Sequence, residues 1–398
     1  MRLAAIYASL LCEFISLGMM MPLTPFLATE LGASPFLLSV MMASAGLVAM
    51  IAAIVLGVLS DKHGRKPVLL VTVVGAGLAN LLVALVPTLP GLFASRLLAG
   101  LVGGNLPVAI SMIADVTEER DRAKFIAYLM ALVAVGMVAG NALAGLVGGK
   151  GSDFNYVGVA LFSAALSFLS AAIVMFLVAE TRHDASAVGS ETRPAMSREL
   201  AYRLMILGGG LILAIQLLLQ TSIQSSLDVV MPLYLKDRLA FTAQDFGFFL
   251  ATVGSVLIVT QVLATGPITH RIGDSGMLRL TLGTVVVGGI IAIAAPFDAR
   301  SGAIGLALMM MGQGMSQPLF HSIVSKSVAP ENRGAFVGMV EALAGIGRIF
   351  GPLVAGALYP LRSGTASLAV VSTIALTLIL WRGIAARREG NTPKIIKI

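Results

Sequence analysis

The chain alternates between long apolar runs and short polar stretches, and this pattern predicts the fold. About 18 or more consecutive apolar residues are typical of a transmembrane helix, and twelve runs approach or exceed that length. They cover residues 3–29, 36–60, 68–88, 91–114, 125–148, 157–179, 202–235, 241–269, 277–297, 302–325, 335–358 and 364–384. The runs lack the alternation of apolar and polar residues that membrane β-strands show. We therefore expect an all-α integral membrane protein with twelve transmembrane helices.

Composition and charge agree with this prediction. The chain is 57% hydrophobic and 12% charged, whereas soluble domains contain about 25% charged residues. Twenty of the 27 Lys and Arg residues fall in one alternating set of loops that includes both termini. Basic loops stay on the cytoplasmic side, so we expect both termini in the cytoplasm. The net charge of +7 follows from these loops, and no patch typical of nucleic-acid binding is present.

The two halves of the chain resemble each other at a nearly constant spacing. Arg122-Ala123-Lys124-Phe125 aligns with Arg333-Gly334-Ala335-Phe336 at an offset of 211 residues, and several glycines align at the same offset. This repeat predicts two pseudo-symmetric six-helix bundles, an N-terminal one (1–179) and a C-terminal one (202–398, with a short cytoplasmic tail), joined by a cytoplasmic linker (180–201). Parallel repeats of this kind place a substrate site near the middle of the membrane, between the halves.

Three motifs resemble those of a known family. The stretches are Gly57-x-Leu59-x-Asp61-Lys62-x-Gly64-Arg65-Lys66, Leu92-x-x-x-Arg96-x-x-x-Gly100 and Gly18-x-x-x-Pro22-x-x-Pro25. They resemble the signature loop and the span-four and span-one motifs of the major facilitator superfamily, in particular its bacterial tetracycline and multidrug exporters. The resemblance implies the major facilitator fold, a bacterial cytoplasmic (inner) membrane location and proton-coupled drug export. One difference is Gly140-Asn141, where antiporters of this kind carry Gly-Pro.

Charged residues inside predicted spans are costly and usually face a cavity or a partner. Glu13 lies about ten residues into the first span, roughly 15 Å deep at the rise of an α-helix. Arg96 lies inside the fourth span. The two are either a structural ion pair or a proton-coupling pair in which Glu13 binds the proton, and the resemblance implies a coupling role for Arg96. Asp228 in the seventh span is a third candidate for proton coupling.

Polar side chains gather in the spans that are expected to face a cavity. The seventh span is unusually polar around Asp228, which indicates either a wet face or hydrogen bonds between helices. The substrate-cavity candidates are Glu13, Asn105, Gln220, Gln224, Asp228, Gln313, Gln317 and His321. A packed neutral imidazole is the alternative for His321.

Other residues are expected to hold or bend helices. Glu341 and Arg348 lie two turns apart in the eleventh span and are predicted to form an ion pair. Small residues permit close helix approach in lipid, and the expected packing and bending sites are Gly136, Gly140, Gly145, Gly347, Gly351 and Pro352.

The charged loop at 57–66 is predicted to be a conformational latch. A carboxylate at a helix end, such as Asp61, accepts hydrogen bonds from the N-terminus of a neighbouring helix, and Gly57 and Gly64 would permit the close approach. The resemblance implies that this loop, with Arg65, closes the cytoplasmic side. The alternative is an ordinary solvated loop on the basic side of the membrane.

The sequence gives no support for an enzyme. It contains no phosphate-binding Gly-x-x-x-x-Gly-Lys motif, and its four histidines show no metal-ligand spacing. We expect no metal or cofactor, and an ion gradient as the energy source. The partners expected are a small-molecule substrate, protons and the lipid bilayer, with no nucleic acid and a monomeric state. Three functions stay open: a proton-coupled exporter of small lipophilic or cationic compounds, a proton symporter or facilitator for a metabolite or organic anion, and a non-transporting receptor or scaffold.

Overall fold

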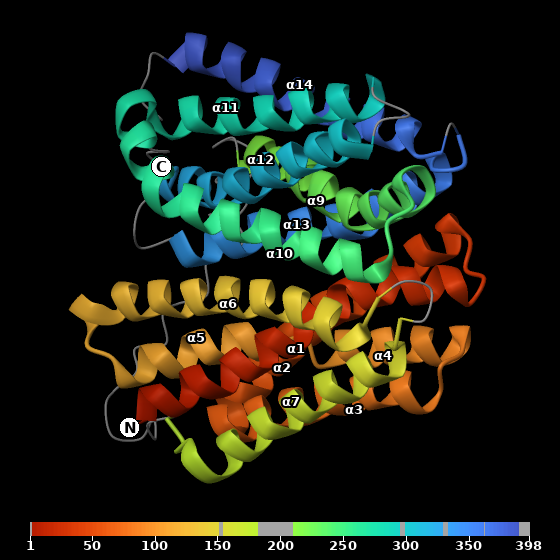
Figure 1. Cartoon of the computed structure of the whole chain (residues 1–398). Helices are drawn as coiled ribbons and strands as arrows, with labels where there is room; N and C mark the ends of the chain where they lie inside the picture. The colour runs from red at the N-terminus through yellow and green to blue at the C-terminus, as the bar shows by residue number, and fades with distance from the viewer. Residues whose placement is uncertain are drawn as a thin grey trace. The chain divides into compact units, whose positions relative to one another are not determined.

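The computed structural model describes residues 2–150, 154–181, 210–294, 299–328, 333–361 and 363–389, and within these ranges the chain forms helices and no strand. Most of the predicted linker (182–201), the beginning of the seventh span (202–209) and the tail (390–398) lie outside the described residues. Figure 1 shows the helices. Their bounds are α1 Arg2–Glu30, α2 Pro35–His63, α3 Arg65–Leu85, α4 Leu89–Leu101, α5 Asn105–Val116, α6 Glu119–Gly148, α7 Tyr156–Leu177, α9 Gly210–Leu239, α10 Ala243–Thr260 continued by a π-helical turn Gln261–Thr265, α11 Gly266–Ala294, α12 Ala299–Lys326, α13 Arg333–Leu358 and α14 Thr365–Glu389.

These helices account for the twelve predicted spans, with one difference. The fourth span is broken at residues 102–104 into α4 and α5, because Val102-Gly103-Gly104 places two residues of low helix propensity in succession. Eleven spans within the described residues are long and apolar enough to cross a membrane, the span at 89–116 included. The twelfth, α12, is as long but contains Gln313, Ser316 and Gln317.

The chain divides into two compact units, and the sequence repeat reappears in how each unit is packed. Unit 1 comprises Met1–Ala185 and Ala240–Ser255, and unit 2 comprises Ser186–Leu239 and Val256–Ile398. In unit 1, α1 packs against α6 and α7, and α3 packs against α4 and α7. In unit 2, α9 packs against α13 and α14, and α11 packs against α12 and α14. The repeat-related helices thus make the same contacts, which confirms the pseudo-symmetric pair of helix bundles.

The residues assigned to unit 1 include the first half of α10. Gln244 donates a hydrogen bond from Nε2 to the carbonyl of Gly145 on α6 at 3.1 Å. Gly247 faces the carbonyl of Asn141, so that a Cβ there would lie 2.7 Å from that oxygen. Small residues on both helices permit this close approach. The predicted boundary at residue 202 places all of α10 in the C-terminal bundle, whereas the structure groups residues 240–255 with unit 1.

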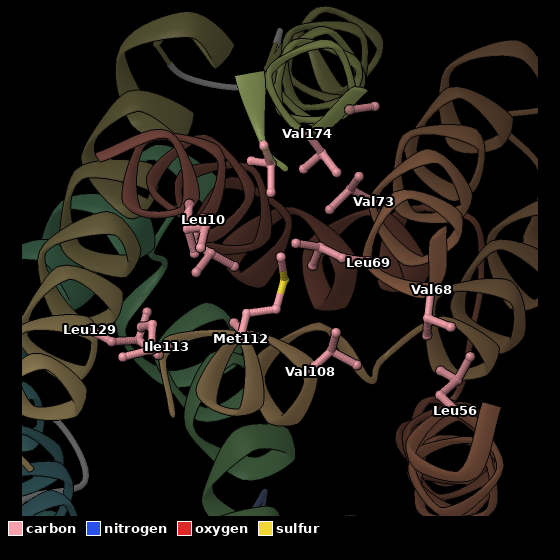
Figure 2. Packing of buried hydrophobic residues seen from close by; sticks show 14 of the residues in the cluster. Leu10, Leu56, Val68, Leu69, Val73, Val108, Met112, Ile113, Leu129 and Val174 are labelled. Carbon is pink, nitrogen blue, oxygen red and sulfur yellow. The ribbon is translucent and has the colours of Figure 1, made fainter. Parts of the chain in front are cut away.

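The apolar core of unit 1 is formed in part by α2 and α3, the helices on either side of the charged loop. Figure 2 shows apolar side chains of this core, and the labelled ones come from α1, α2, α3, α5, α6 and α7. They are Leu10 of α1, Leu56 of α2, Val68, Leu69 and Val73 of α3, Val108, Met112 and Ile113 of α5, Leu129 of α6 and Val174 of α7. Close van der Waals packing of this kind holds helices together where lipid tails are as apolar as the side chains. It fixes the ends of α2, α3 and α5 relative to one another.

Repeat-related glycines lie at the main helix crossing of each unit. A Cβ on Gly136 or Gly140 of α6 would collide with the backbone or Cβ atoms of α1 at residues 14–19. A Cβ on Gly347 or Gly351 of α13 would collide with α9 at residues 218–225. Each pair therefore lets two helices touch backbone to backbone. Gly145 faces Phe248 of α10, and Pro352 lies inside α13.

Candidate functional site

The charged loop between α2 and α3 forms a network of ion pairs inside unit 1. Arg65, the first residue of α3, donates from Nε to Asp115 at the end of α5 at 3.3 Å and from Nη1 to Ser60 at 3.2 Å. Arg65 also pairs with Asp61 one turn earlier. The side chains of Arg65 and Asp115 are 18% and 26% exposed, so this contact is partly shielded from water. The network ties the ends of three helices to one side chain.

A carboxylate that the sequence reasoning missed caps α3. Glu180, just beyond α7, accepts hydrogen bonds from the backbone N–H groups of Arg65 at 2.9 Å and Lys66 at 3.1 Å. These are among the first N–H groups of α3, which have no partner within the helix, and the helix dipole favours a negative charge there. Gly64 lies directly beneath this carboxylate, with φ of +104° and a Cβ position 2.5 Å from Glu180 Oε2. Only glycine satisfies both conditions without strain.

Unit 2 contains the same arrangement with the charges reversed. Gly273 aligns with Gly64 at an offset of 209 residues and likewise has a positive φ, of +72°. The next residue, Asp274, accepts a hydrogen bond from Lys326 Nζ at 2.5 Å. Lys326 aligns with Asp115 at the offset of 211. An arginine–aspartate pair in one unit therefore corresponds to an aspartate–lysine pair in the other.

Gly57 differs from the other glycine of the predicted latch. A Cβ placed on Gly57 would meet nothing within 4 Å in the part of the chain that the structure describes. The close helix contact expected there is therefore absent from unit 1. Asp61 is two-thirds exposed and makes its ion pair with Arg65.

Glu13 is buried inside unit 1, beside a cluster of hydroxyl groups. Its side chain is turned toward α7, where Ser167 hydrogen-bonds to the carboxyl group. One turn further along α1, Ser16 bonds to Ser163 and Ser167 of α7 at 2.8 and 2.9 Å, and Asn80 of α3 donates to Ser16 at 3.1 Å. Oε2 of Glu13 has no hydrogen-bond partner among the described residues. The sequence signal for this cluster, serines four residues apart in an apolar run, was missed.

Arg96 lies on α4, seven residues after the helix begins and before the break in the span. Its Nε donates to Ser95 Oγ at 3.3 Å, and Nη2 is buried without a hydrogen-bond partner in the described ranges. No ion pair joins Arg96 to Glu13, both of which belong to the described part of the chain. The structural ion pair considered for these two residues is therefore not formed. Asn105 begins α5 just beyond the break, and its Oδ1 accepts from the N–H of Leu106 at 2.8 Å.

The polar residues of the seventh span serve two different purposes in unit 2. Gln220 of α9 donates to Gln313 of α12 at 3.0 Å, and Gln313 donates to the carbonyl of Gln220 at 3.0 Å. Both side chains are fully buried. Three hydroxyl groups of α9 donate to backbone carbonyls of α13: Thr221 to Ala344, Ser225 to Gly347 and Ser226 to Gly351. These groups join helices, as the alternative to a wet face predicted.

Gln224 and Asp228 remain partly accessible on another side of α9. Gln224 donates from Nε2 to Asp228 Oδ1 at 3.0 Å, one helical turn away. Gln317 of α12 is likewise half-buried. Of the amides predicted to line a cavity, the structure thus leaves Asn105, Gln224 and Gln317 accessible and uses Gln220 and Gln313 inside the bundle.

Glu341 has a second partner besides the predicted one. Arg348 lies 3.4 Å from Glu341 Oε2, and His321 Nδ1 of α12 lies 2.8 Å from Glu341 Oε1. The three side chains link α12 to α13. Sequence reasoning did not connect His321 to this pair, because the two helices are distant in the sequence.

No cluster of three or more His, Cys, Asp or Glu side chains suited to a metal ion exists within the described ranges.

The family model described as Major Facilitator Superfamily matches residues 6–329 and 213–397, which together span nearly the whole chain. The chain belongs to the Major Facilitator Superfamily. It is 30% identical over 376 residues to the tetracycline resistance protein, class G, of Vibrio anguillarum, with 92% of each chain covered. It is 23% identical over 396 residues to multidrug resistance protein 1 of Bacillus subtilis (strain 168), with 96% of this chain and 97% of the other covered.

Solved structures of other transporters share the fold. A D-xylose–proton symporter matches with a TM-score of 0.76 at 15% identity, covering 96% of each chain. A nucleoside transporter matches with a TM-score of 0.75 at 17% identity, covering 98% of this chain and 100% of the other. At this level of identity the likeness establishes the fold alone. The family match and the long apolar helices make the chain an integral membrane protein.

Proposed function

We propose that this protein is a secondary active transporter that works by alternating access and exports small lipophilic or cationic compounds in exchange for protons. It would reside in a bacterial cytoplasmic membrane as a monomer, with both termini in the cytoplasm. Support comes from relatives named for tetracycline and multidrug resistance that align over most of the chain. The short connections of the described helices suit a transporter better than a receptor or scaffold.

The observation that carries the coupling mechanism is Glu13. An ionised carboxylate buried without full partners is costly, and ionisable residues at this depth in a membrane protein usually serve function. Glu13 lacks a partner on Oε2 and lies beside the hydroxyl cluster of α1, α3 and α7. We assign it the bound proton in this state. When the proton leaves, the Ser167 hydroxyl beside the carboxyl group would turn toward the charge.

Arg96 and Asp228 complete the proposed coupling set. Arg96 has a buried guanidinium nitrogen without a partner in the described ranges, which a carboxylate exposed by the transport cycle could satisfy. Asp228 is held by Gln224 on an accessible side of α9, where it suits a cationic group of the substrate. Gln224, Gln317 and His321 are the proposed polar contacts of the substrate in unit 2, and Asn105 is the one proposed in unit 1.

The experiment that tests this proposal uses inverted membrane vesicles acidified inside by respiration. Compounds are added from a panel of tetracyclines, lipophilic cations, sugars and organic anions, and the internal pH is followed by dye quenching. We expect release of protons with tetracyclines or lipophilic cations, and loss of this release in Glu13→Gln. Glu30→Gln is the matched control, because Glu30 lies at the end of the same helix and bonds to Tyr156.

Two outcomes would contradict the proposal. Proton release that persists in Glu13→Gln removes Glu13 from the mechanism. The absence of release with every compound, in vesicles that contain folded protein, contradicts export by antiport.

A second function, proton symport or facilitated transport of a metabolite or organic anion, is favoured by one observation. Asn141 follows Gly140 where exporters of this kind carry proline, and its Oδ1 is buried without a hydrogen-bond partner among the described residues. Uptake of a labelled sugar or organic anion driven by an inward proton gradient, in right-side-out vesicles, would establish this alternative.

A further inference from the structure

Three ionisable side chains of unit 2 form a connected triad that the proposed coupling set does not use. Glu341 of α13 presents one carboxylate oxygen to His321 of α12 at 2.8 Å and the other to Arg348 at 3.4 Å. We assign the proton of the neutral imidazole to Nδ1, the nitrogen that faces the Glu341 carboxylate at ion-pair distance. The other ring nitrogen, Nε2, is then free to accept a proton.

The triad lies inside the membrane-spanning part of two helices and is accessible. Glu341 is eight residues from the beginning of α13, about 12 Å along the axis, and Arg348 is two turns further. The side chains of His321, Glu341 and Arg348 are 39%, 27% and 49% exposed. Charged groups at such depth are not stable against hydrocarbon and face water or a polar ligand. These three side chains are paired with one another and remain partly exposed, which leaves the imidazole open to a proton.

The fold itself does not require these charges. At the repeat offset of 211, His321 corresponds to Ile110, Glu341 to Met130 and Arg348 to Met137. Ile110 and Met137 pack against the apolar core cluster of unit 1. The same packing arrangement is therefore built from apolar side chains in one unit and from an ionisable triad in the other.

The neighbouring ionisable groups of unit 2 have other partners. Asp228 of α9 is bound by Gln224, Asp274 of α11 pairs with Lys326, and the guanidinium of Arg382 of α14 lies 5.3 Å from the ring centre of Phe320. The other charged or titratable side chains described on α9, α11 and α12 are Tyr234, Lys236, Asp237 and Arg238 of α9, His270, Arg271 and Arg279 of α11, and Arg300 of α12. None of them forms an ion pair with His321 or Glu341 in the part of the chain described.

We propose that His321, Glu341 and Arg348 form a proton-binding site in the second unit, separate from Glu13. A proton leaves hydronium and binds Nε2 of the neutral imidazole, while Nδ1 keeps its own proton and stays beside the Glu341 carboxylate. Arg348 holds the carboxylate in place from its other oxygen. The charge of the triad then changes from zero to +1. This inference rests on the proposed function, since a triad that becomes positive would repel a cationic substrate and admit it only after the proton has left.

The first test observes the site without any substrate. The chain has four histidines, so protein labelled at histidine and held in lipid nanodiscs gives few imidazole NMR signals, and His321→Gln identifies the one that belongs to the triad. Glu341→Gln should change the pH midpoint of the His321 signal, because it removes the charge that lies 2.8 Å from the imidazole. Asp274→Asn, a change in an ion pair one turn away along α12, is the control and should leave the midpoint in place.

The second test measures the pH profile of export. His321→Gln should flatten the profile, with at least a tenfold smaller change in rate across the titration range, while Asp274→Asn keeps it. A triple variant, His321→Ile with Glu341→Met and Arg348→Met, carries the apolar residues found at the repeat-related positions of unit 1. It tests the site in case His321→Gln does not fold, and it should show the same flattened profile. An unchanged His321 midpoint in Glu341→Gln, or an unchanged pH profile in folded His321→Gln, would overturn the site.

The two proposals fail in different ways. A triad that titrates as expected in a protein that releases no protons with any compound supports the site and contradicts antiport. Proton-coupled export whose pH profile is the same in the wild type and in His321→Gln supports antiport and contradicts the site.

Discussion

The two glycines of the charged loop provide a test in which the same substitution has opposite effects. Both Gly57 and Gly64 belong to the motif that resembles the family signature, so the sequence gives no reason to separate them. The structure does: Gly64 has φ of +104° beneath Glu180, whereas Gly57 lies inside α2 with open space around it. We expect Gly64→Ala to destabilise the protein and Gly57→Ala to stabilise it.

The magnitudes follow from the contacts. At Gly64 an alanine would adopt a strained backbone conformation at a cost of about 1–3 kcal/mol. Its Cβ would also displace the Glu180 carboxylate from two N–H groups in an exposed setting, which adds about 1 kcal/mol. At Gly57 an alanine in a helix interior gains about 0.5–1 kcal/mol. Gly273→Ala isolates the backbone effect, because φ is +72° but no atom of the described residues lies within 4 Å of its Cβ position.

The assay is the temperature at which purified protein in detergent loses half of its monodisperse fraction after heating. Gly64→Ala should lower this temperature most, Gly273→Ala less, and Gly57→Ala should raise it. In a Glu180→Ala background, Gly64→Ala should lose about 1 kcal/mol of its cost, since the colliding group is gone. Equal costs at Gly57 and Gly64, or a neutral Gly64→Ala, would refute the reasoning. A loss of transport in a stable Gly57→Ala would assign Gly57 to the transport cycle instead of the fold.

Three further predictions concern unit 2. Asp274→Lys should lower stability by about 1 kcal/mol, because it places two like charges together. Adding Lys326→Asp should restore most of the lost stability in the same heating assay. No recovery in the double variant would show that the pair does not contribute. Gly347→Leu should prevent α13 from packing against α9 and abolish folded protein. Gly338→Ala should be tolerated, because no described atom lies near its Cβ position. Equal yields of the two variants on size-exclusion chromatography would contradict this prediction. Burial and the Asp237 carboxylate raise the pKa of Tyr359 above its ordinary value. The stability that the Tyr359 hydroxyl contributes is therefore fully present below the ordinary pKa of about 10. It is lost as the pH rises through the higher pKa of the folded protein. The melting temperature of the wild type should therefore fall at strongly alkaline pH more than that of Tyr359→Phe, and parallel curves for the two proteins would contradict this sign.

Much of the architecture followed from the sequence because hydrophobic length and repeat spacing are local properties. A helix that crosses lipid must satisfy its own backbone hydrogen bonds, so each long apolar run allows one structure. The alignment of Gly136 with Gly347 and of Gly140 with Gly351 predicted packing sites, and the structure places them where α6 meets α1 and where α13 meets α9. The break at Val102-Gly103-Gly104 was not predicted, because paired glycines weaken a helix without determining whether neighbours hold it straight.

The candidate site depended on facts that the sequence does not contain. Glu13 and Arg96 both lie inside predicted spans, but only the folded structure shows that Glu13 lies beside Ser167 of α7 and makes no ion pair with Arg96 in the described chain. The polarity of α9 was visible in the sequence. Its division into helix-joining groups, such as Gln220, and accessible ones, such as Asp228, was not.

The sequence by itself thus determined the membrane-spanning helices, the twofold repeat and the residue types available for coupling, since these depend on the order of apolar and polar residues along the chain. The tertiary structure alone decided which of those residues meet. Glu180 reached the N-terminus of α3, Asp274 met Lys326, and His321 met Glu341 across tens of residues of chain or more. Such contacts depend on how helices are packed and rotated against one another, and that is set by many small van der Waals contacts that no single motif encodes.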